Sequence, residues 1–244
     1  MNSSWKERAR LFIPPILPRA VRKVRGMWNK DQPAMPSLEV RELRELFPGI
    51  EAVTVGLALS QLPREPGMLP LTELVVLAAL CKYLQPKRAL EIGTHKGSSA
   101  LAMAMHTPPE AEIFTLDLPS WDATTMYPVD NGEITGKPFS IGDLYRGTAY
   151  EKKIRQLYGD SAGFDFEALR NAIDLVFIDG SHTYENVKID TQNAWEVLRR
   201  GGVIIWDDYH PEWGPGVMRV LHEITDRPVY HIAGTRLAAS RAQV

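Results

Sequence analysis

Acidic side chains follow directly after four short apolar stretches of this 244-residue chain: Glu91, Asp117, Asp179 and the adjacent pair Asp207 and Asp208. Short apolar runs between polar segments are typical of buried strands. Because open parallel sheets bind ligands outside the carboxyl ends of their strands, we expect these carboxylates to converge on one cleft. The alternative role, for one or two of them, is capping of the helix that follows.

Three of these acids are candidate metal ligands. Asp179, Asp207 and Asp208 end two strands that we expect to be neighbours, and unpaired carboxylates packed together repel and raise one another's pKa. A divalent cation would remove this conflict. An all-oxygen ligand set selects hard ions, so we predict Mg²⁺, with Mn²⁺ or Ca²⁺ as alternatives.

His182 is the candidate general base. It lies three residues after Asp179, near enough to stand beside a substrate hydroxyl held at the metal. An imidazole is well suited to accept a proton near neutral pH. The alternative for a lone histidine is a structural hydrogen bond. We make no assignment for His95 or His210.

The first of these strands continues into a glycine-containing turn, Glu91-Ile-Gly93-Thr-His-Lys-Gly97-Ser-Ser99. Glycines let a ligand approach the backbone, and a helix N-terminus offers free N–H donors. The turn lacks the G-x-G-x-x-G pattern of a pyrophosphate site, and an acid where the first glycine would stand favours a positively charged ligand. Asp117, at the end of the next strand, is placed to accept hydrogen bonds from two ribose hydroxyls.

The elements that must position these residues alternate between helices and strands from Leu71 onward. This order predicts an α/β fold with a doubly wound, mostly parallel seven-stranded sheet and helices on both faces. Its domain spans residues 51–244, and residues 119–147, too long for a simple connection, form a lid or substrate loop. We expect helices at 71–84, 97–106 and 184–198, and strands at 88–92, 112–116, 154–158, 173–178, 202–206, 229–232 and 235–239.

Residues 1–50 are expected to be a separate basic extension and linker. Residues 1–30 hold eight Lys and Arg against Glu7 alone, and residues 18–28 predict a basic amphipathic helix. Such a helix could pack on its own domain or a second subunit, or lie on an anionic membrane surface. Ser37 could cap a further short helix that ends at Phe47.

Composition narrows the class of protein. The single Cys81 excludes an internal disulfide and a multi-cysteine zinc site, which suits a reducing, cytoplasmic location. No run of 18 apolar residues predicts a membrane-spanning helix. Residues 31–244 carry 20 basic and 29 acidic residues, which disfavours nonspecific nucleic-acid binding. We expect a homo-oligomer with a small-molecule substrate and no nucleic-acid partner.

Residues 89–99 resemble motif I of class I S-adenosylmethionine-dependent methyltransferases, and the similarity runs from about Leu71 to Arg241. Residues 173–184 and 201–209 resemble the branch that contains macrocin O-methyltransferase and cephalosporin hydroxylase-like proteins, and more distantly catechol O-methyltransferase. By this resemblance the metal lies at the three acids named above. It also implies the following residues around the cofactor: Glu91, Gly93, Gly97, Asp117, Asp160, Ser161 and Asp179. The hydroxyls of Thr94, Ser98 and Ser99 could reach the cofactor carboxylate or could instead cap the helix.

The resemblance and the acids together predict a metal-assisted O-methyltransferase that acts on a hydroxylated small molecule, such as a sugar or secondary metabolite. The metal would bind a substrate hydroxyl, His182 would remove its proton, and the oxygen would attack the cofactor methyl. The alternatives are a cephalosporin hydroxylase-like activity and a cofactor-binding protein without catalysis. An NAD-dependent oxidoreductase is a further alternative, which the absent G-x-G-x-x-G disfavours.

Overall fold

The computed structural model describes residues 37–63, 67–120, 123–129 and 140–243. The chain divides into two compact units, residues 1–35 and 36–244, and all described residues belong to the second. The basic amphipathic helix expected at residues 18–28 lies outside the described residues. Among those residues, no helix has both the length and the apolar character needed to cross a bilayer.

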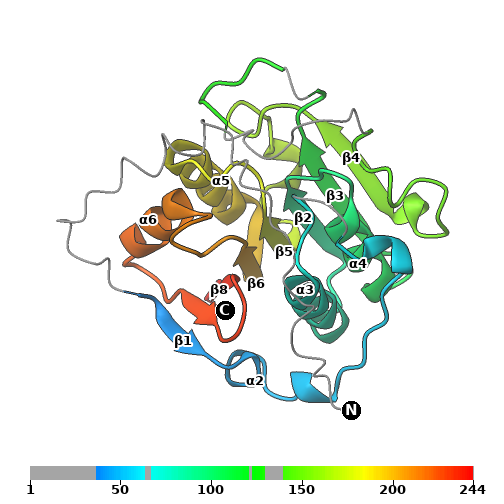
Figure 1. The fold of residues 1–244 in the computed structure, drawn as a ribbon, viewed down its shortest axis with the longest axis horizontal. Coiled ribbons are helices and arrows are strands. Elements are labelled where there is room, and N and C mark those ends of the chain that lie inside the picture. The colour runs from blue at the N-terminus through cyan, green and yellow to red at the C-terminus, as the bar shows by residue number, and fades with distance from the viewer. Residues whose placement is uncertain (1–36, 64–66, 121–122, 130–139, 244) are drawn as a thin grey trace, which may run out of the picture. The chain divides into compact units, whose positions relative to one another are not determined.

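An eight-stranded sheet forms the centre of the second unit (Figure 1). Its order is β1-β7-β8-β6-β5-β2-β3-β4, and all neighbouring pairs are parallel except those that involve β8. The chain winds in opposite directions from β2 and β5, so a ligand crevice is expected between them. The strands are Glu39–Arg41 (β1), Arg88–Ile92 (β2), Glu112–Asp117 (β3), Ile154–Tyr158 (β4), Ile173–Ile178 (β5), Leu198–Trp206 (β6), Tyr230–Ile232 (β7) and Ala238–Arg241 (β8).

Helices cover both faces of this sheet (Figure 1). Side chains alternate between the faces along a strand, so Leu175 and Phe177 of β5 pack with α3 and α4, whereas Val176 and Ile178 pack with α5 and α6. The α-helices are Leu43–Leu46 (α2), Leu71–Leu84 (α3), Ser98–His106 (α4), Tyr184–Val197 (α5) and Pro215–Glu223 (α6). The 3-10 helices are Ile50–Ala52, Leu59–Gln61, Glu151–Lys153 and Glu167–Leu169. The predicted doubly wound α/β fold is confirmed.

The sheet has one strand more than the seven predicted. The helix expected from Ser37 to Phe47 is wrong, because residues 39–41 form β1 and only Leu43–Leu46 are helical. Val40 pairs in parallel with His231 of β7, so a partner distant in sequence satisfies backbone groups that a helix would have satisfied locally. The sheet therefore begins before residue 51, where we expected the domain to start.

The last strand also differs from the prediction. It was expected at residues 235–239 and lies at Ala238–Arg241, because residues 233–237 form the turn of a hairpin. The hydroxyl of Thr235 donates to the carbonyl of Ile232 at 2.8 Å and accepts from the amide of Leu237 at 2.9 Å. These bonds stabilise a turn where the apolar pattern suggested a strand.

Candidate active site at the carboxyl edge of the sheet

The backbone ladder brings the predicted acids to one edge of the sheet. The amide of Asp179 donates to the carbonyl of Ile92 at 2.8 Å, and the amide of Asp207 donates to the carbonyl of Ile178 at 2.9 Å. These bonds extend the pairing of β2, β5 and β6 one residue beyond their ends. Asp179 and Asp207 are therefore neighbours across adjacent strands, as predicted.

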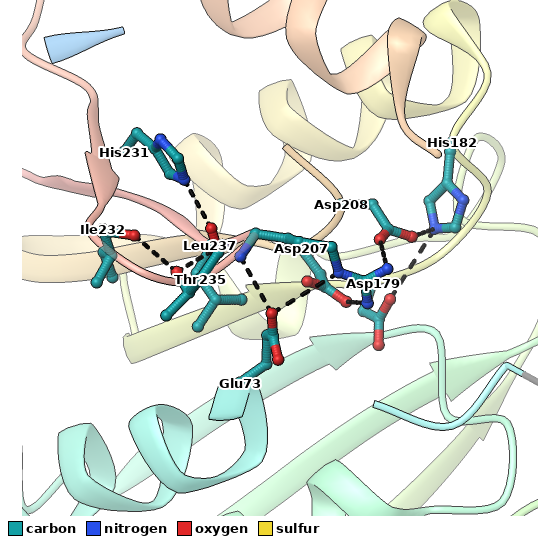
Figure 2. A network of polar contacts seen from close by, with 10 residues as sticks. Glu73, Asp179, His182, Asp207, Asp208, His231, Ile232, Thr235 and Leu237 are labelled. Carbon is teal, nitrogen blue, oxygen red and sulfur yellow. Dashed lines mark hydrogen bonds and ion pairs between the residues drawn. The ribbon is translucent and has the colours of Figure 1, made fainter. Parts of the chain in front are cut away.

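Asp179, His182 and Asp208 form an acid–histidine cluster in which one ligand atom of each lies within 4.8 Å of the others (Figure 2). The Nε2 atom of His182 is 3.1 Å from Oδ2 of Asp208 and 4.0 Å from Oδ1 of Asp179. Burial, together with the nearby charge of Asp208, raises the pKa of Asp179 to about 6. Two oxygens and an imidazole nitrogen at this spacing form a donor set that fits a divalent cation.

Asp207 does not belong to this cluster. Its side chain is buried, and its Oδ2 atom lies 3.6 Å from a guanidinium nitrogen of Arg236. Burial is the main cause that raises the pKa of Asp207 well above its ordinary value, and the charges of Asp179 and Asp208 add to it. The structure thus brings together two of the three predicted acid ligands with His182, and turns the third toward an arginine.

Arg236 and Glu73 are the residues of this region that the sequence analysis missed. Arg236 also lies 2.8 Å from Oδ1 of Asp208 and 3.7 Å from Oε1 of Glu73. Glu73 is buried and stands four residues before Leu77, on the side of α3 that faces the core. A charged residue on an apolar helix face was the available signal for Glu73, whereas no local pattern marked Arg236.

Close backbone packing sets the directions of Asp208 and His182. Asp208 has a positive φ of 54°. A Cβ atom on Gly214 would stand 1.9 Å from the carbonyl oxygen of Asp208, and one on Gly216 would stand 2.2 Å from that of His182. Both glycines belong to the start of α6, with Gly214 at its cap. Only glycine lets this helix end approach both residues, which holds the loop that carries them.

Glu91 occupies a buried polar site beside this edge. The hydroxyl of Thr115 donates to its Oε2 atom, whereas Oε1 has no hydrogen-bond partner among the described residues. Burial raises the pKa of Glu91 to about 8. An orphaned acceptor of this kind, at the end of β2, fits a cationic or hydrogen-bond-donating ligand group.

The three predicted hydroxyl helpers of the cofactor are buried. The hydroxyl of Thr94 is 2.6 Å from that of Thr115 and accepts from Gln156 at 3.0 Å. Ser99 lies beside Glu91, and Ser98 exchanges hydrogen bonds with Gln61. These three hydroxyls therefore all have protein partners close by. Gln156, which donates to Thr94, carried no signal in the sequence.

The two glycines of the turn are required by close approach. A Cβ atom on Gly93, which has a φ of 103°, would stand 1.9 Å from the carbonyl oxygen of Asp179. One on Gly97, which has a φ of 80°, would stand 2.5 Å from the ring of Tyr145. Gly93 thus lets β2 and β5 meet at the switch point, and Gly97 admits the end of the predicted lid.

Asp117 ends β3 with its carboxylate against the turn. Its Oδ2 atom accepts from the amide of His95 and its Oδ1 atom from the amide of Leu118, both at 2.7 Å. A carboxylate has about four acceptor positions, so each oxygen can accept a further hydroxyl. Asp160 is held in the same way, since its Oδ2 atom accepts from the amide of Met126 at 2.6 Å. Ser161 follows it and lies beside Asp190 of α5.

The described parts of the predicted lid, residues 119–120, 123–129 and 140–147, contact this site from two sides. The amides of Gly142 and Leu144 donate to the carbonyls of His95 and Lys96, both at 2.9 Å. The carbonyl of Pro128 accepts from the side chain of Asn186 at the start of α5 at 2.8 Å. The segment therefore joins the glycine turn to the loop that carries His182.

Comparison with known proteins identifies the domain. Residues 90–209 match the model of a family described as a methyltransferase domain. Residues 90–209 of this chain belong to a methyltransferase domain. The match includes the turn after β2, the acid–histidine cluster and Asp207. The resemblance to class I S-adenosylmethionine-dependent methyltransferases is confirmed at the level of family and fold.

Solved structures share the fold of the methyltransferase domain at low sequence identity. The O-methyltransferase TomG from Streptomyces achromogenes, in complex with SAM, is 16% identical, with a TM-score of 0.55 over 81% of this chain and 96% of its own. The O-methyltransferase from Bacillus cereus, in complex with SAH, is also 16% identical, with a TM-score of 0.53 over 81% and 97%. SAH-bound PaMTH1 from Podospora anserina is 17% identical, with a TM-score of 0.56 over 96% and 99%.

A relative by sequence is an uncharacterized protein, R132, of Acanthamoeba polyphaga mimivirus. It is 39% identical to this chain over 59 residues, which cover 24% of this chain and 27% of the viral protein. The chain thus spans about a quarter of the length of that relative.

Proposed function

We propose that this chain is an S-adenosylmethionine-dependent O-methyltransferase that uses a divalent cation and acts on a hydroxyl of a small molecule, such as a sugar or secondary metabolite. The observation that carries the proposal is the acid–histidine cluster at the end of β5 and β6, one strand from Glu91 on β2. The family match and the SAM- and SAH-bound neighbours support the cofactor.

The cofactor residues fit S-adenosylmethionine. The unpaired Oε1 atom of Glu91 suits a positively charged group, and the spare acceptor positions of Asp117 suit two ribose hydroxyls. Gly93 and Gly97 bring backbone close to the ligand. Asp160 and Ser161, beyond β4, are proposed to lie beside the adenine. When bound, the cofactor supplies a methyl group on a cationic sulfonium, and the metal lowers the pKa of the substrate hydroxyl.

Residues of the chain would bind the cation, accept the proton and exclude water. Asp179 and Asp208 would hold the cation with their carboxylate oxygens. His182 would accept the hydroxyl proton at the ring nitrogen that does not face Asp208, because the contact of Nε2 with Oδ2 of Asp208 at 3.1 Å orients the ring. The segment 119–147 would exclude water from the reacting groups. The acidic edge of the sheet favours the approach of a sulfonium cation.

Calorimetric titration tests the cofactor first. We expect micromolar binding of S-adenosylmethionine and S-adenosylhomocysteine and none of NAD. Asp117→Asn should weaken both ligands by about tenfold, because an amide loses acceptor positions toward hydroxyl donors. Asp165→Asn, at an exposed position, is the matched control and should bind as the wild type does. Failure of both sulfur ligands to bind would refute the proposed cofactor.

A screen over hydroxylated metabolites with Mg²⁺ or chelator tests the chemistry. Asp179→Asn and Asp208→Asn should abolish metal-dependent turnover and leave cofactor affinity within about threefold. His182→Gln should abolish turnover but retain the bound cation, which separates a base from a third ligand. Normal turnover of Asp179→Asn in excess chelator would refute the role of the metal.

A further inference from the structure

The guanidinium of Arg236 lies beside the candidate metal site. Arg236 contacts the carboxylates of Glu73, Asp207 and Asp208 at 3.7, 3.6 and 2.8 Å. The three acids come from α3 and from the end of β6, whereas the arginine comes from the turn between β7 and β8. Figure 2 shows Glu73, Asp207 and Asp208 of this group.

The backbone of Arg236 is held on both sides of its side chain. Its amide donates to Oε1 of Glu73 at 3.1 Å, and its carbonyl accepts from the amide of Tyr209 at 2.8 Å. The turn before it is fixed as well, since the carbonyl of Thr235 lies 2.7 Å from Nε2 of His231 (Figure 2). A long side chain on so constrained a backbone loses little further freedom when it pairs.

Charge explains why an internal cation is needed at this point. The carboxyl groups of Glu73, Asp207 and Asp208 are all buried, with residue exposures of 4%, 3% and 7%. Asp179 lies close to Asp208, so four acidic side chains gather at this point, three from the ends of β5 and β6 and one from α3. Without a cation, carboxylates so placed repel one another and lose hydration. The guanidinium of Arg236 offsets one negative charge, and the remaining negative charge lies near Asp179.

The contacts of Asp208 divide this group of acids into two sides. Its Oδ1 atom is paired with Arg236, whereas its Oδ2 atom faces His182. Asp207 contacts Arg236 only on the first side and is absent from the acid–histidine cluster. The carboxylate of Asp208 therefore contacts both Arg236 and His182, and its orientation depends on the guanidinium.

We propose that Arg236 is a positioning residue for the metal site, and that Asp207 is the ionic partner of Arg236 rather than a metal ligand. Arg236 keeps the carboxylate of Asp207 directed away from the cation and holds Asp208 with Oδ2 toward it. This inference rests on the divalent cation of the proposed function. It revises the metal set predicted from the sequence, in which all three acids were ligands.

Mn²⁺ affinity of the full-length protein, measured by electron paramagnetic resonance and calorimetry without substrate, tests the inference. We expect Asp207→Asn to bind Mn²⁺ within about twofold of the wild type, and its isosteric match Asp208→Asn to bind at least tenfold more weakly. If Asp207→Asn lost affinity as Asp208→Asn does, Asp207 would be a ligand and the proposal would be wrong.

A double-mutant cycle tests the role of Arg236. In Arg236→Gln the carboxylate of Asp207 is released, so adding Asp207→Asn to that variant should now weaken Mn²⁺ binding about tenfold. Arg236→Lys keeps the charge and should retain the wild-type insensitivity to Asp207→Asn. Equal effects of Asp207→Asn in the wild type and in Arg236→Gln would overturn the positioning role.

Two other outcomes of these experiments have separate interpretations. If Arg236→Gln fails to fold, Arg236→Lys and the single Asp207→Asn variant still decide whether Asp207 is a ligand. If the folded wild type binds no Mn²⁺ at millimolar concentration, the metal of the proposed function is refuted, and the inference falls with it.

Discussion

Replacement of Glu91 by glutamine should make the stability of the protein less dependent on pH. Glu91 is fully buried, and burial raises its pKa from an ordinary value of 4.5 to about 8. A carboxyl group whose pKa is raised on folding holds its proton more tightly in the folded state than in the unfolded state. Its ionisation at high pH therefore destabilises the folded state. The wild type therefore loses stability as pH rises from the unfolded pKa through the folded one. Glutamine has no proton to lose in this range.

The magnitude follows from the two pKa values. The full shift from 4.5 to about 8 corresponds to about 5 kcal/mol above pH 8. Between pH 5.5 and pH 8.5 the ionisable group changes the free energy of unfolding by about 3 kcal/mol. For a domain of this size, that change corresponds to about 6 to 12 °C in melting temperature. The constant cost of burying an amide cancels because the same variant is compared at two pH values.

Urea unfolding of the wild type and Glu91→Gln at pH 5.5 and pH 8.5 measures this difference. We expect the variant to gain about 3 kcal/mol relative to the wild type between the two conditions. Glu110→Gln, at an exposed turn, is the matched control and should follow the wild type within about 0.5 kcal/mol. If the difference in unfolding free energy between Glu91→Gln and the wild type stayed constant within about 1 kcal/mol from pH 5.5 to pH 8.5, Glu91 could not be neutral and buried at the lower pH. The same variant should bind S-adenosylmethionine more weakly if Glu91 contacts its cationic part.

Three other substitutions test packing by thermal and urea unfolding, two of them beside the site and one at the far end of α4. Gly93→Ala should cost about 3 kcal/mol or more, because the new methyl group would stand 1.9 Å from the carbonyl oxygen of Asp179; near-wild-type stability would contradict this packing. Tyr145→Phe should cost about 1 kcal/mol through the lost 2.6 Å bond to Gln156, and no loss would show that water replaces it. Lys153→Met should cost about 1 to 2 kcal/mol, because the ammonium bonds two carbonyls at the end of α4; an unchanged midpoint would show that its desolvation offsets these bonds.

Much of the fold could be predicted from the sequence because its signals are local. The apolar runs at residues 88–92 and 173–178 are β2 and β5 in full, and the helix expected at 71–84 is α3. The acids after these strands also lie where they were expected, because parallel strands must end at a common edge. Strand β1 could not be predicted in this way, since only pairing with β7 makes a strand of two exposed residues and the half-buried Arg41.

The sequence by itself determined the central strands β2 to β5, which acids follow the strands and which family the turn after β2 resembles. Only the tertiary structure decided which of those acids contact His182 and which contact Arg236. Arg236 lies nearly thirty residues after Asp207, and it reaches the site because antiparallel pairing aligns Trp206 with Ala238. Burial likewise decided that the hydroxyl of Thr94 lies 2.6 Å from that of Thr115. Side-chain partners across strands depend on register and burial, which no local pattern of residues records.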